Sequence, residues 1–116
     1  MIIRIKNLRI RTILGINDWE RENKQDIIIN IKIEFDGTRA GHTDAIEDTL
    51  DYKAIKNNII QSVEQSKFFL IEKLAVFITD LIMADEKVLA ASVEIDKPHA
   101  LRFADSVSIE HSVRRA

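Results

Sequence analysis

A run of alternating apolar residues constrains the fold of this chain more than any other feature. Between Asp26 and Phe35 an apolar side chain recurs at every second position, and mostly polar residues such as Asn30, Lys32 and Glu34 stand between them. Successive side chains of a strand point to opposite faces, so this pattern predicts a strand with one buried and one polar face. The buried set is predicted to be Ile27, Ile29, Ile31, Ile33 and Phe35.

Three further segments have strand character. Met1 to Leu14 alternates but changes phase once, at Lys6-Asn7, as a β-bulge would cause. Val93 to Asp96 and Phe103 to Val113 alternate on either side of a bend that holds the only proline. The sequence therefore predicts two strands at each end of the chain.

The middle of the chain carries two patterns of helical period. Ile55, Ile59 and Val63 recur every four residues, and Asp48 or Thr49 is the predicted N-cap of that helix. Ser66-Lys67 separates it from a second, more apolar helix predicted from Phe69 to about Met83.

The order strand, strand, helix, helix, strand, strand predicts an α+β fold with a four-stranded antiparallel sheet. Two helices cover one face of such a sheet, and residues 1–116 are expected to form a single domain. Long strands with open edges generally need a neighbour. We therefore expect a closed homo-oligomer whose sheets join edge to edge.

Composition narrows the classes of function. The 116 residues are 46% hydrophobic and 31% charged, with a formal net charge of −2 and no basic stripe, so nucleic acid is not an expected partner. Cysteine is absent, and His42, His99 and His111 lack metal-ligand spacing, so no metal site is expected. Apolar runs fall far short of the ~20 residues that span a bilayer. We expect a cytoplasmic protein with no membrane partner.

Two positions carry the clearest signs of chemistry. Glu72 falls in the first turn of the apolar helix, where a carboxylate is favoured and could accept two parallel N–H donors from a pterin or guanine edge. Lys97 ends a strand directly before the proline bend, where it could act as an acid or base. The pattern alone favours an ordinary solvated side chain at both positions.

Other candidates are weaker. Tyr52, the only tyrosine, could stack on a ring or move a proton, although core packing explains it better. Glu20 lies in the polar loop Asn17 to Lys24, where a solvated role is the simpler interpretation. His99 and Arg102 could contact an anionic ligand tail, as could Arg9 and Arg11, whose directions the sequence leaves open.

Several short stretches of the sequence together resemble one known family. They are Ile3-Arg4-Ile5-Lys6-Asn7-Leu8, Gly15-Ile16 with Glu20 and Gln25-Asp26, Leu50-Asp51-Tyr52, Leu70-Ile71-Glu72-Lys73-Leu74, and Val93 to Ser108. Over nearly its whole length the chain resembles the dihydroneopterin aldolase/epimerase family of pterin enzymes. The stretch from Glu94 to Arg102, followed by Ala104 to Ser108, looks most like the dihydroneopterin triphosphate 2′-epimerase branch. The aldolase branch usually has small or apolar residues after the Lys-Pro pair.

The resemblance implies the tunnelling fold, in which four ββααββ subunits form a barrel and two rings stack into an octamer. It implies that Glu72 and the backbone of Ile71 anchor the pterin, and that Tyr52 reaches the ring from a neighbouring subunit. Lys97 would be the acid/base, and Glu20 would position the substrate side chain. Neither a cofactor nor a metal would be needed, because the dihydropterin is its own electron sink.

The resemblance leaves three functions open. The favoured one is epimerisation at C2′ of dihydroneopterin triphosphate to the dihydromonapterin form. The second is the aldolase reaction of folate biosynthesis, which gives 6-hydroxymethyl-7,8-dihydropterin and glycolaldehyde. The third is a non-catalytic oligomer that binds a pterin or purine.

Overall fold

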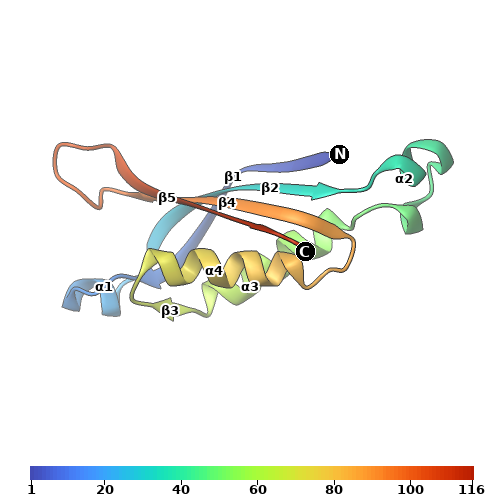
Figure 1. The fold of residues 1–116 in the computed structure, drawn as a ribbon. Helices are drawn as coiled ribbons and strands as arrows, with labels where there is room; N and C mark the ends of the chain where they lie inside the picture. The colour runs from blue at the N-terminus through green and yellow to red at the C-terminus, as the bar shows by residue number, and fades with distance from the viewer.

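A computed structural model describes residues 1–116 and has one sheet with helices on one of its faces (Figure 1). The elements in chain order are β1 (Ile2–Leu14), α1 (Asp18–Glu22), β2 (Gln25–Phe35), α2 (Thr38–Thr43), the 3-10 helix η1 (Ile46–Asp48), α3 (Tyr52–Glu64), β3 (Lys67–Phe68), α4 (Ile71–Met83), β4 (Val88–Pro98) and β5 (Ser106–Arg114). The predicted order of two strands, two helices and two strands is confirmed, with short additions in its loops.

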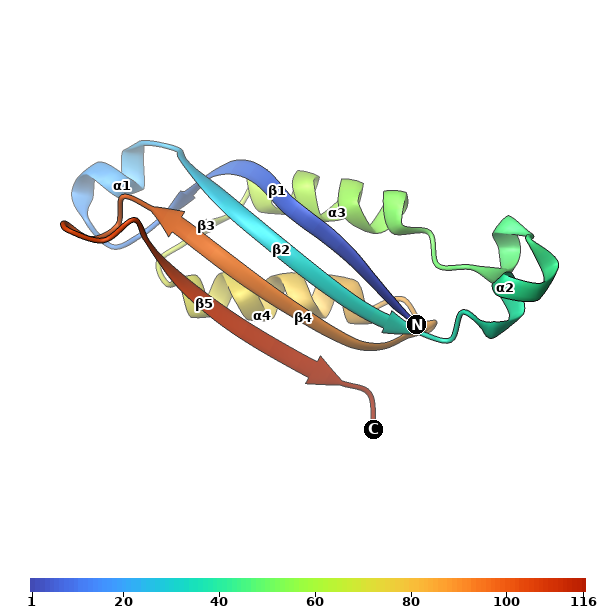
Figure 2. The ribbon, with the colours of Figure 1, turned by 90° about the horizontal axis from the view of Figure 1, so that it is seen from above.

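The sheet has five strands in the order β3-β1-β2-β4-β5, whereas the sequence predicts four (Figure 2). The extra strand, β3, pairs parallel to β1 through Ile13 with Lys67 and Leu14 with Phe68. The Thr12 hydroxyl donates to the carbonyl oxygen of Val63 at 2.7 Å and so fixes the end of α3 against β1. The Ser66-Lys67 break between the helices thereby becomes a sheet edge, and two residues are too few to produce an alternating pattern.

The predicted bulge in β1 is confirmed. Its register with β2 shifts between Ile5 and Leu8, and Asn7 adopts a left-handed φ of 54°. The side-chain oxygen of Asn30 accepts the Asn7 amide at 2.9 Å, which satisfies the backbone group that the bulge would otherwise leave unpaired.

The predicted core is also confirmed. All five alternating residues of β2 are buried, and α3 and α4 cover this face of the sheet. The two helices bury Ile55, Ile59, Val63, Leu74 and Ile78 against it. The opposite face carries the polar residues and has no covering element.

Two predicted boundaries are wrong for local reasons. The N-cap of α3 is Asp51, whose side chain accepts the Ala54 amide at 3.0 Å, rather than Asp48 or Thr49. Asp48 ends η1 and pairs with Arg39 instead. The last strand begins at Ser106, because Phe103 lies in the preceding loop with a left-handed φ of 68° and a fully exposed ring.

The molecule is elongated along its strands. Its radius of gyration is 15.5 Å and its extents are 52 × 26 × 24 Å, against ~13 Å for a compact domain of this length. Helix α1, the start of α4 and the β4–β5 loop gather at one end, and the start of α3 lies toward the other (Figure 1). None of the helices has the length and apolarity to cross a bilayer.

Candidate active site

One hollow brings together four of the residues singled out in the sequence. It has a volume of about 220 Å³ and lies where the end of β1, α1, the start of α4 and the β4–β5 loop meet. Glu20, Ile71, Glu72 and Lys97 all line it. The rest of its wall is largely apolar and consists of Leu14, Gly15, Ile16, Phe69, Leu70, Ala100 and Val107.

The shortest polar contact in the hollow joins Lys97 to Glu20. The Lys97 ammonium donates to Glu20 Oε2 at 2.5 Å, and the two side chains are only 16% and 13% exposed. Seventy-seven positions separate these residues in the chain. Only the fold, by pairing β4 against β2 and closing α1 over the end of β1, brings them together.

Further donors surround the Glu20 carboxylate. Gln25 Nε2 donates to Oε2 at 3.1 Å, and Asn17 donates to Oε1 through its side chain at 3.0 Å and its backbone amide at 3.3 Å. Burial of Glu20 raises its pKa, but the hydrogen bonds from Lys97, Gln25 and Asn17, with the Lys97 charge, outweigh burial and lower it to about 2. Glu20 is therefore a fixed anion at neutral pH.

Gly15 makes room for that carboxylate. A Cβ at this position would lie 2.2 Å from Glu20 Cδ, a distance that no real Cβ contact shows. Gly15 also has a φ of 135°, which side-chain-bearing residues rarely adopt. The Gly15-Ile16 pair therefore has a physical role in the site, since only glycine lets Glu20 approach the backbone so closely.

The start of α4 supplies the opposite wall of the hollow. Leu70 precedes the helix without a side-chain cap, and Ile71 and Glu72 form its first turn. Amide groups of a first helical turn have no partner within the helix, and they favour anions and hydrogen-bond acceptors. Glu72 is exposed and forms no ion pair within the chain, so its carboxylate is free to accept donors from a ligand.

Arg21 joins the two walls and was missed in the sequence. Its guanidinium donates to the carbonyl oxygens of Gly15 and Phe68 at 3.1 Å and of Lys67 at 2.8 Å. It also lies 3.9 Å from the centre of the Phe69 ring, which lines the hollow. Arg21 therefore ties the helix that carries Glu20 to the segment that leads into Glu72. Gln25, the first residue of β2, and Asn17, the N-cap of α1, were not predicted as site residues either, because isolated polar side chains give no periodic signal.

Tyr52 lies outside this hollow. It is 55% exposed at the start of α3, where it lines a separate hollow of about 410 Å³. A single chain therefore does not unite Tyr52 with Glu20, Glu72 and Lys97. Its contribution from a neighbouring subunit stays a prediction.

The predicted phosphate contacts also lie outside the hollow. His99 and Arg102 are exposed in the β4–β5 loop, and the Arg102 guanidinium lies 5.6 Å from the Phe103 ring centre. His99 has a left-handed φ of 62°. Arg11 pairs with Asp26 at 3.2 Å, and Arg9 is exposed.

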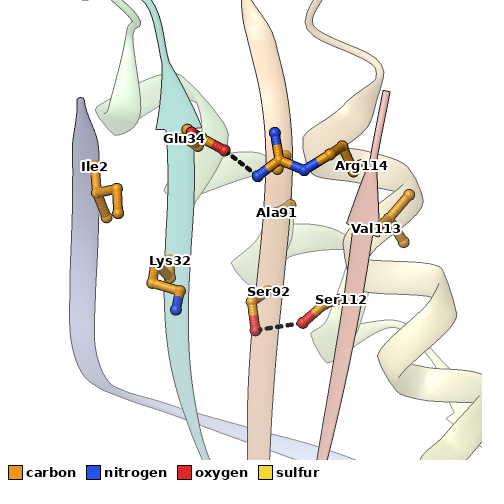
Figure 3. Close-up of a pocket in the computed structure, with 9 residues that line it drawn as sticks. Ile2, Lys32, Glu34, Ala91, Ser92, Ser112, Val113 and Arg114 are labelled. Carbon is orange, nitrogen blue, oxygen red and sulfur yellow. Dashed lines mark hydrogen bonds and ion pairs between the residues drawn. The ribbon is translucent and has the colours of Figure 1, made fainter. Parts of the chain in front are cut away.

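A third hollow, of about 350 Å³, lies on the open face of the sheet (Figure 3). Its charged and polar groups largely engage one another: Arg114 donates to Glu34 at 2.5 Å, and Ser112 to Ser92 at 3.0 Å. It contains none of the residues singled out in the sequence. The chain also brings no three His, Cys, Asp or Glu side chains together as a metal would require.

Solved structures define the class of this fold. A crystal structure from Vibrio cholerae described as a dihydroneopterin aldolase has a TM-score of 0.95 and 29% identity, covering 99% of this chain and 98% of that one. Escherichia coli dihydroneopterin aldolase in complex with neopterin has a TM-score of 0.92 and 26% identity, covering 97% and 98%. The predicted α+β tunnelling fold is confirmed for the single chain.

Sequence similarity identifies the family of this chain. Residues 3–112 match the FolB dihydroneopterin aldolase family, and the chain belongs to it. Escherichia coli dihydroneopterin triphosphate 2′-epimerase is 48% identical over 114 residues, 98% of this chain and 95% of that protein. Escherichia coli dihydroneopterin aldolase is 28% identical over 108 residues, 93% of this chain and 88% of that protein. The predicted resemblance is confirmed, and this chain is more similar to the epimerase than to the aldolase.

Proposed function

We propose that this protein is a pterin epimerase that inverts C2′ of 7,8-dihydroneopterin triphosphate. The observation that carries the proposal is the partly buried Lys97–Glu20 pair, which shares one apolar hollow with Glu72 at the start of α4. This arrangement offers a proton-transfer group opposite an anchor for a flat heterocycle. The 48% identity to an epimerase, against 28% to an aldolase, supports the choice of reaction.

The proposed binding mode uses the first turn of α4. The Glu72 carboxylate accepts two parallel hydrogen bonds from the amino-pyrimidinone edge of the pterin, and the backbone of Ile71 supplies a further one. The apolar side chains around the hollow, including Phe69 and Leu70, cover the rest of the ring. Tyr52 of an adjacent copy flanks the ring and assists proton transfer.

The proposed chemistry centres on Lys97. Removal of the 2′-hydroxyl proton lets C2′ become a carbonyl, the C1′–C2′ bond breaks, and its electron pair moves into the dihydropterin ring protonated at N5. Lys97 lies beside N5 and the side-chain hydroxyls, and it accepts and returns the protons that move in these steps. Glu20 stays ionised at neutral pH, so its role is to hold Lys97 and position the substrate side chain, with water. No metal or cofactor takes part in this scheme.

The outcome depends on the fate of the aldehyde fragment. The aldehyde can stay bound and rotate so that its other face points to C1′. When it re-adds, the pair of electrons returns to the C1′–C2′ bond and C2′ is inverted. If it leaves, the pterin is protonated at C1′ and the products are those of an aldolase. The second candidate is therefore dihydroneopterin aldolase in folate biosynthesis, which the family description supports. A non-catalytic pterin or purine binder is the third.

The proposal includes a cytoplasmic homo-oligomer built as a tetrameric ring, with two rings forming an octamer. Its support is the pair of open sheet edges, β5 and the first part of β1, which present unpaired backbone groups. Adjacent copies would complete each active site. His99 and Arg102 remain predicted contacts for the phosphate tail.

Incubation with dihydroneopterin and with its triphosphate, followed by chiral chromatography, tests this function. Epimerisation gives the 2′-inverted pterin without loss of the side chain. Accumulation of 6-hydroxymethyl-dihydropterin with the released aldehyde as the main products would instead identify an aldolase. Binding of both compounds without any turnover would identify a non-catalytic binder.

A further inference from the structure

The hollow that contains Tyr52 is lined by positively charged residues and by no acidic ones. It is lined by Ile3, Arg4, Ile5, Tyr52, Lys53 and Lys56, so three of its six residues are cations and none is a carboxylate. None of these cations forms an ion pair within the chain. The nearest acid in sequence, Asp51, is engaged in capping the Ala54 amide. Its volume of about 410 Å³ leaves room for a ligand group.

Helix α3 adds to this positive potential. Tyr52 and Lys53 occupy its first turn, where the unpaired amides and the helix dipole favour a negative charge. Lysine is a common phosphate ligand because its ammonium acts as a compact positive charge with three donors. An anion with several phosphate groups is the ligand class that fits three cations spread around one hollow.

The hollow that holds Lys97, in contrast, is unsuited to a polyphosphate. Two of its three charged side chains, Glu20 and Glu72, are carboxylates, and the ammonium of Lys97 is already paired with Glu20. A chain of phosphate groups placed there would meet like charges in an apolar surrounding, which is costly. The tail of a substrate bound by Glu72 must therefore leave this hollow.

Each of the two hollows includes residues from an open edge strand of the sheet. Strand β3 pairs only with Ile13 and Leu14, so the first part of β1 is an open edge, and β5 is the other. Lys97 is paired with Val107 on β5, and both line the first hollow, while Ile3 and Ile5 of β1 line the second. Both hollows lie on the helix-covered side of the sheet, since their walls include α4 and α3 residues respectively. If β5 joins β1 of a second copy, the two hollows lie on the same side of one continuous sheet, on either side of a single seam.

We propose that Lys53 and Lys56 form a subsite that binds the triphosphate of a substrate whose pterin occupies the Glu72–Lys97 hollow of the adjacent copy. This inference rests on the proposed function. It means that the copy adjacent to the pterin-binding copy determines the specificity for the triphosphate. Arg4 also lines a hollow on the open face, so the test relies on the two lysines.

The first experiment detects the subsite without catalysis. Inorganic tripolyphosphate is titrated calorimetrically into the wild-type protein, the Lys53→Gln/Lys56→Gln variant and a Lys24→Gln/Lys32→Gln control, which removes the same charge from residues that line neither hollow. The wild type and the control are expected to bind, with an affinity that falls as salt rises. The Lys53/Lys56 variant is expected to bind about tenfold more weakly or worse, as the loss of charged hydrogen bonds implies. Equal binding by all three proteins would overturn the proposal.

The second experiment measures specificity. The ratio of kcat/KM for dihydroneopterin triphosphate to kcat/KM for dihydroneopterin is expected to fall about tenfold in the Lys53/Lys56 variant and to hold in the control. If this ratio falls instead in a His99→Gln/Arg102→Gln variant, the phosphate lies at the β4–β5 loop and the subsite is refuted. A wild type that turns over neither pterin refutes the proposed function, and the tripolyphosphate titration then still decides the subsite.

Discussion

At the scale of single residues, Lys97 and Glu72 have different proposed roles in the same hollow. Lys97 is partly buried beside Glu20 and would move protons, whereas Glu72 is exposed at the start of α4 and would bind the heterocycle. Both residues stand out in the sequence, but only by residue type and position. Their convergence on one hollow depends on the packing of α4 against the end of β4, which no local pattern encodes.

Substitution of these two residues should separate catalysis from binding. We expect Lys97→Ala to lower kcat by about 10²–10⁴-fold and to retain pterin affinity, because proton transfer is lost while the anchor remains. Glu72→Ala should weaken pterin binding by about tenfold or more, because two charge-assisted hydrogen bonds are lost. Steady-state kinetics with fluorescence titration of neopterin measures both effects, and Lys24→Ala is the control. A Lys97→Ala protein with wild-type kcat would contradict the assignment.

Glu20 should make stability depend on pH in a defined window. Its pKa is about 2 in the folded protein and 4.5 in the reference state, so the unfolded chain binds more protons between these values. The stabilisation from ionised Glu20 is therefore fully present above about pH 4.5 and is lost as the pH falls toward 2. We expect the difference in unfolding free energy between wild type and Glu20→Gln to shrink across that range. Urea titrations at pH 6, 4 and 3 measure it. A constant difference would show that the ion pair does not lower this pKa.

At the scale of elements, the regular strands and helices were predictable from the sequence, and the short elements that connect them were not. The alternation of β2 and the four-residue spacing of Ile55, Ile59 and Val63 are set by burial, so hydrophobic period predicts them. Strand β3 has only two residues, and its position depends on Thr12 holding the end of α3. Helix α1 has no buried residue and is held by Arg21 and a capping box, neither of which has an apolar period.

The Arg21 contacts predict an effect on both stability and turnover. Lysine at this position keeps the positive charge but lacks the planar fork that reaches three carbonyl oxygens. We expect Arg21→Lys to lower the free energy of unfolding by about 1–3 kcal/mol, the range for hydrogen bonds to a charged group. Because Glu20 is on the same short helix, kcat should fall as well. Urea unfolding and kinetics measure the two effects, with the exposed Arg9→Lys as the matched control. Equal behaviour of the two variants would mean that Arg21 does not hold the site.

At the scale of the whole molecule, the proposed function requires that the site of one chain is completed by a second copy. Tyr52 and the Glu20–Lys97 pair line different hollows, although the resemblance assigns them to one reaction. The open edges of the sheet supply the means to join them in adjacent copies. The sequence pointed to the edges through strand length, but it contains no signal for which residues meet across a seam between copies.

A shared site predicts that two inactive variants complement each other. Lys97→Ala and Tyr52→Ala should each be inactive alone, since each removes one half of every site. Refolding an equal mixture should restore about one quarter of wild-type activity, because a site then keeps both residues with a probability of about one quarter in a random cyclic assembly. Activity of the refolded mixture is compared with that of the variants refolded separately. No recovery from well-folded mixed oligomers would mean that one subunit supplies both residues.

The proposed function requires that the hollow between α1, α4 and the β4–β5 loop is the pterin site. A crystal structure of the protein with neopterin tests this most directly. We expect the pterin edge within hydrogen-bond distance of Glu72, the hydroxylated side chain beside Lys97 and Glu20, and Tyr52 of an adjacent copy against the ring. Neopterin bound elsewhere, such as in the open-face hollow of Figure 3, with the Lys97–Glu20 pair untouched, would contradict it.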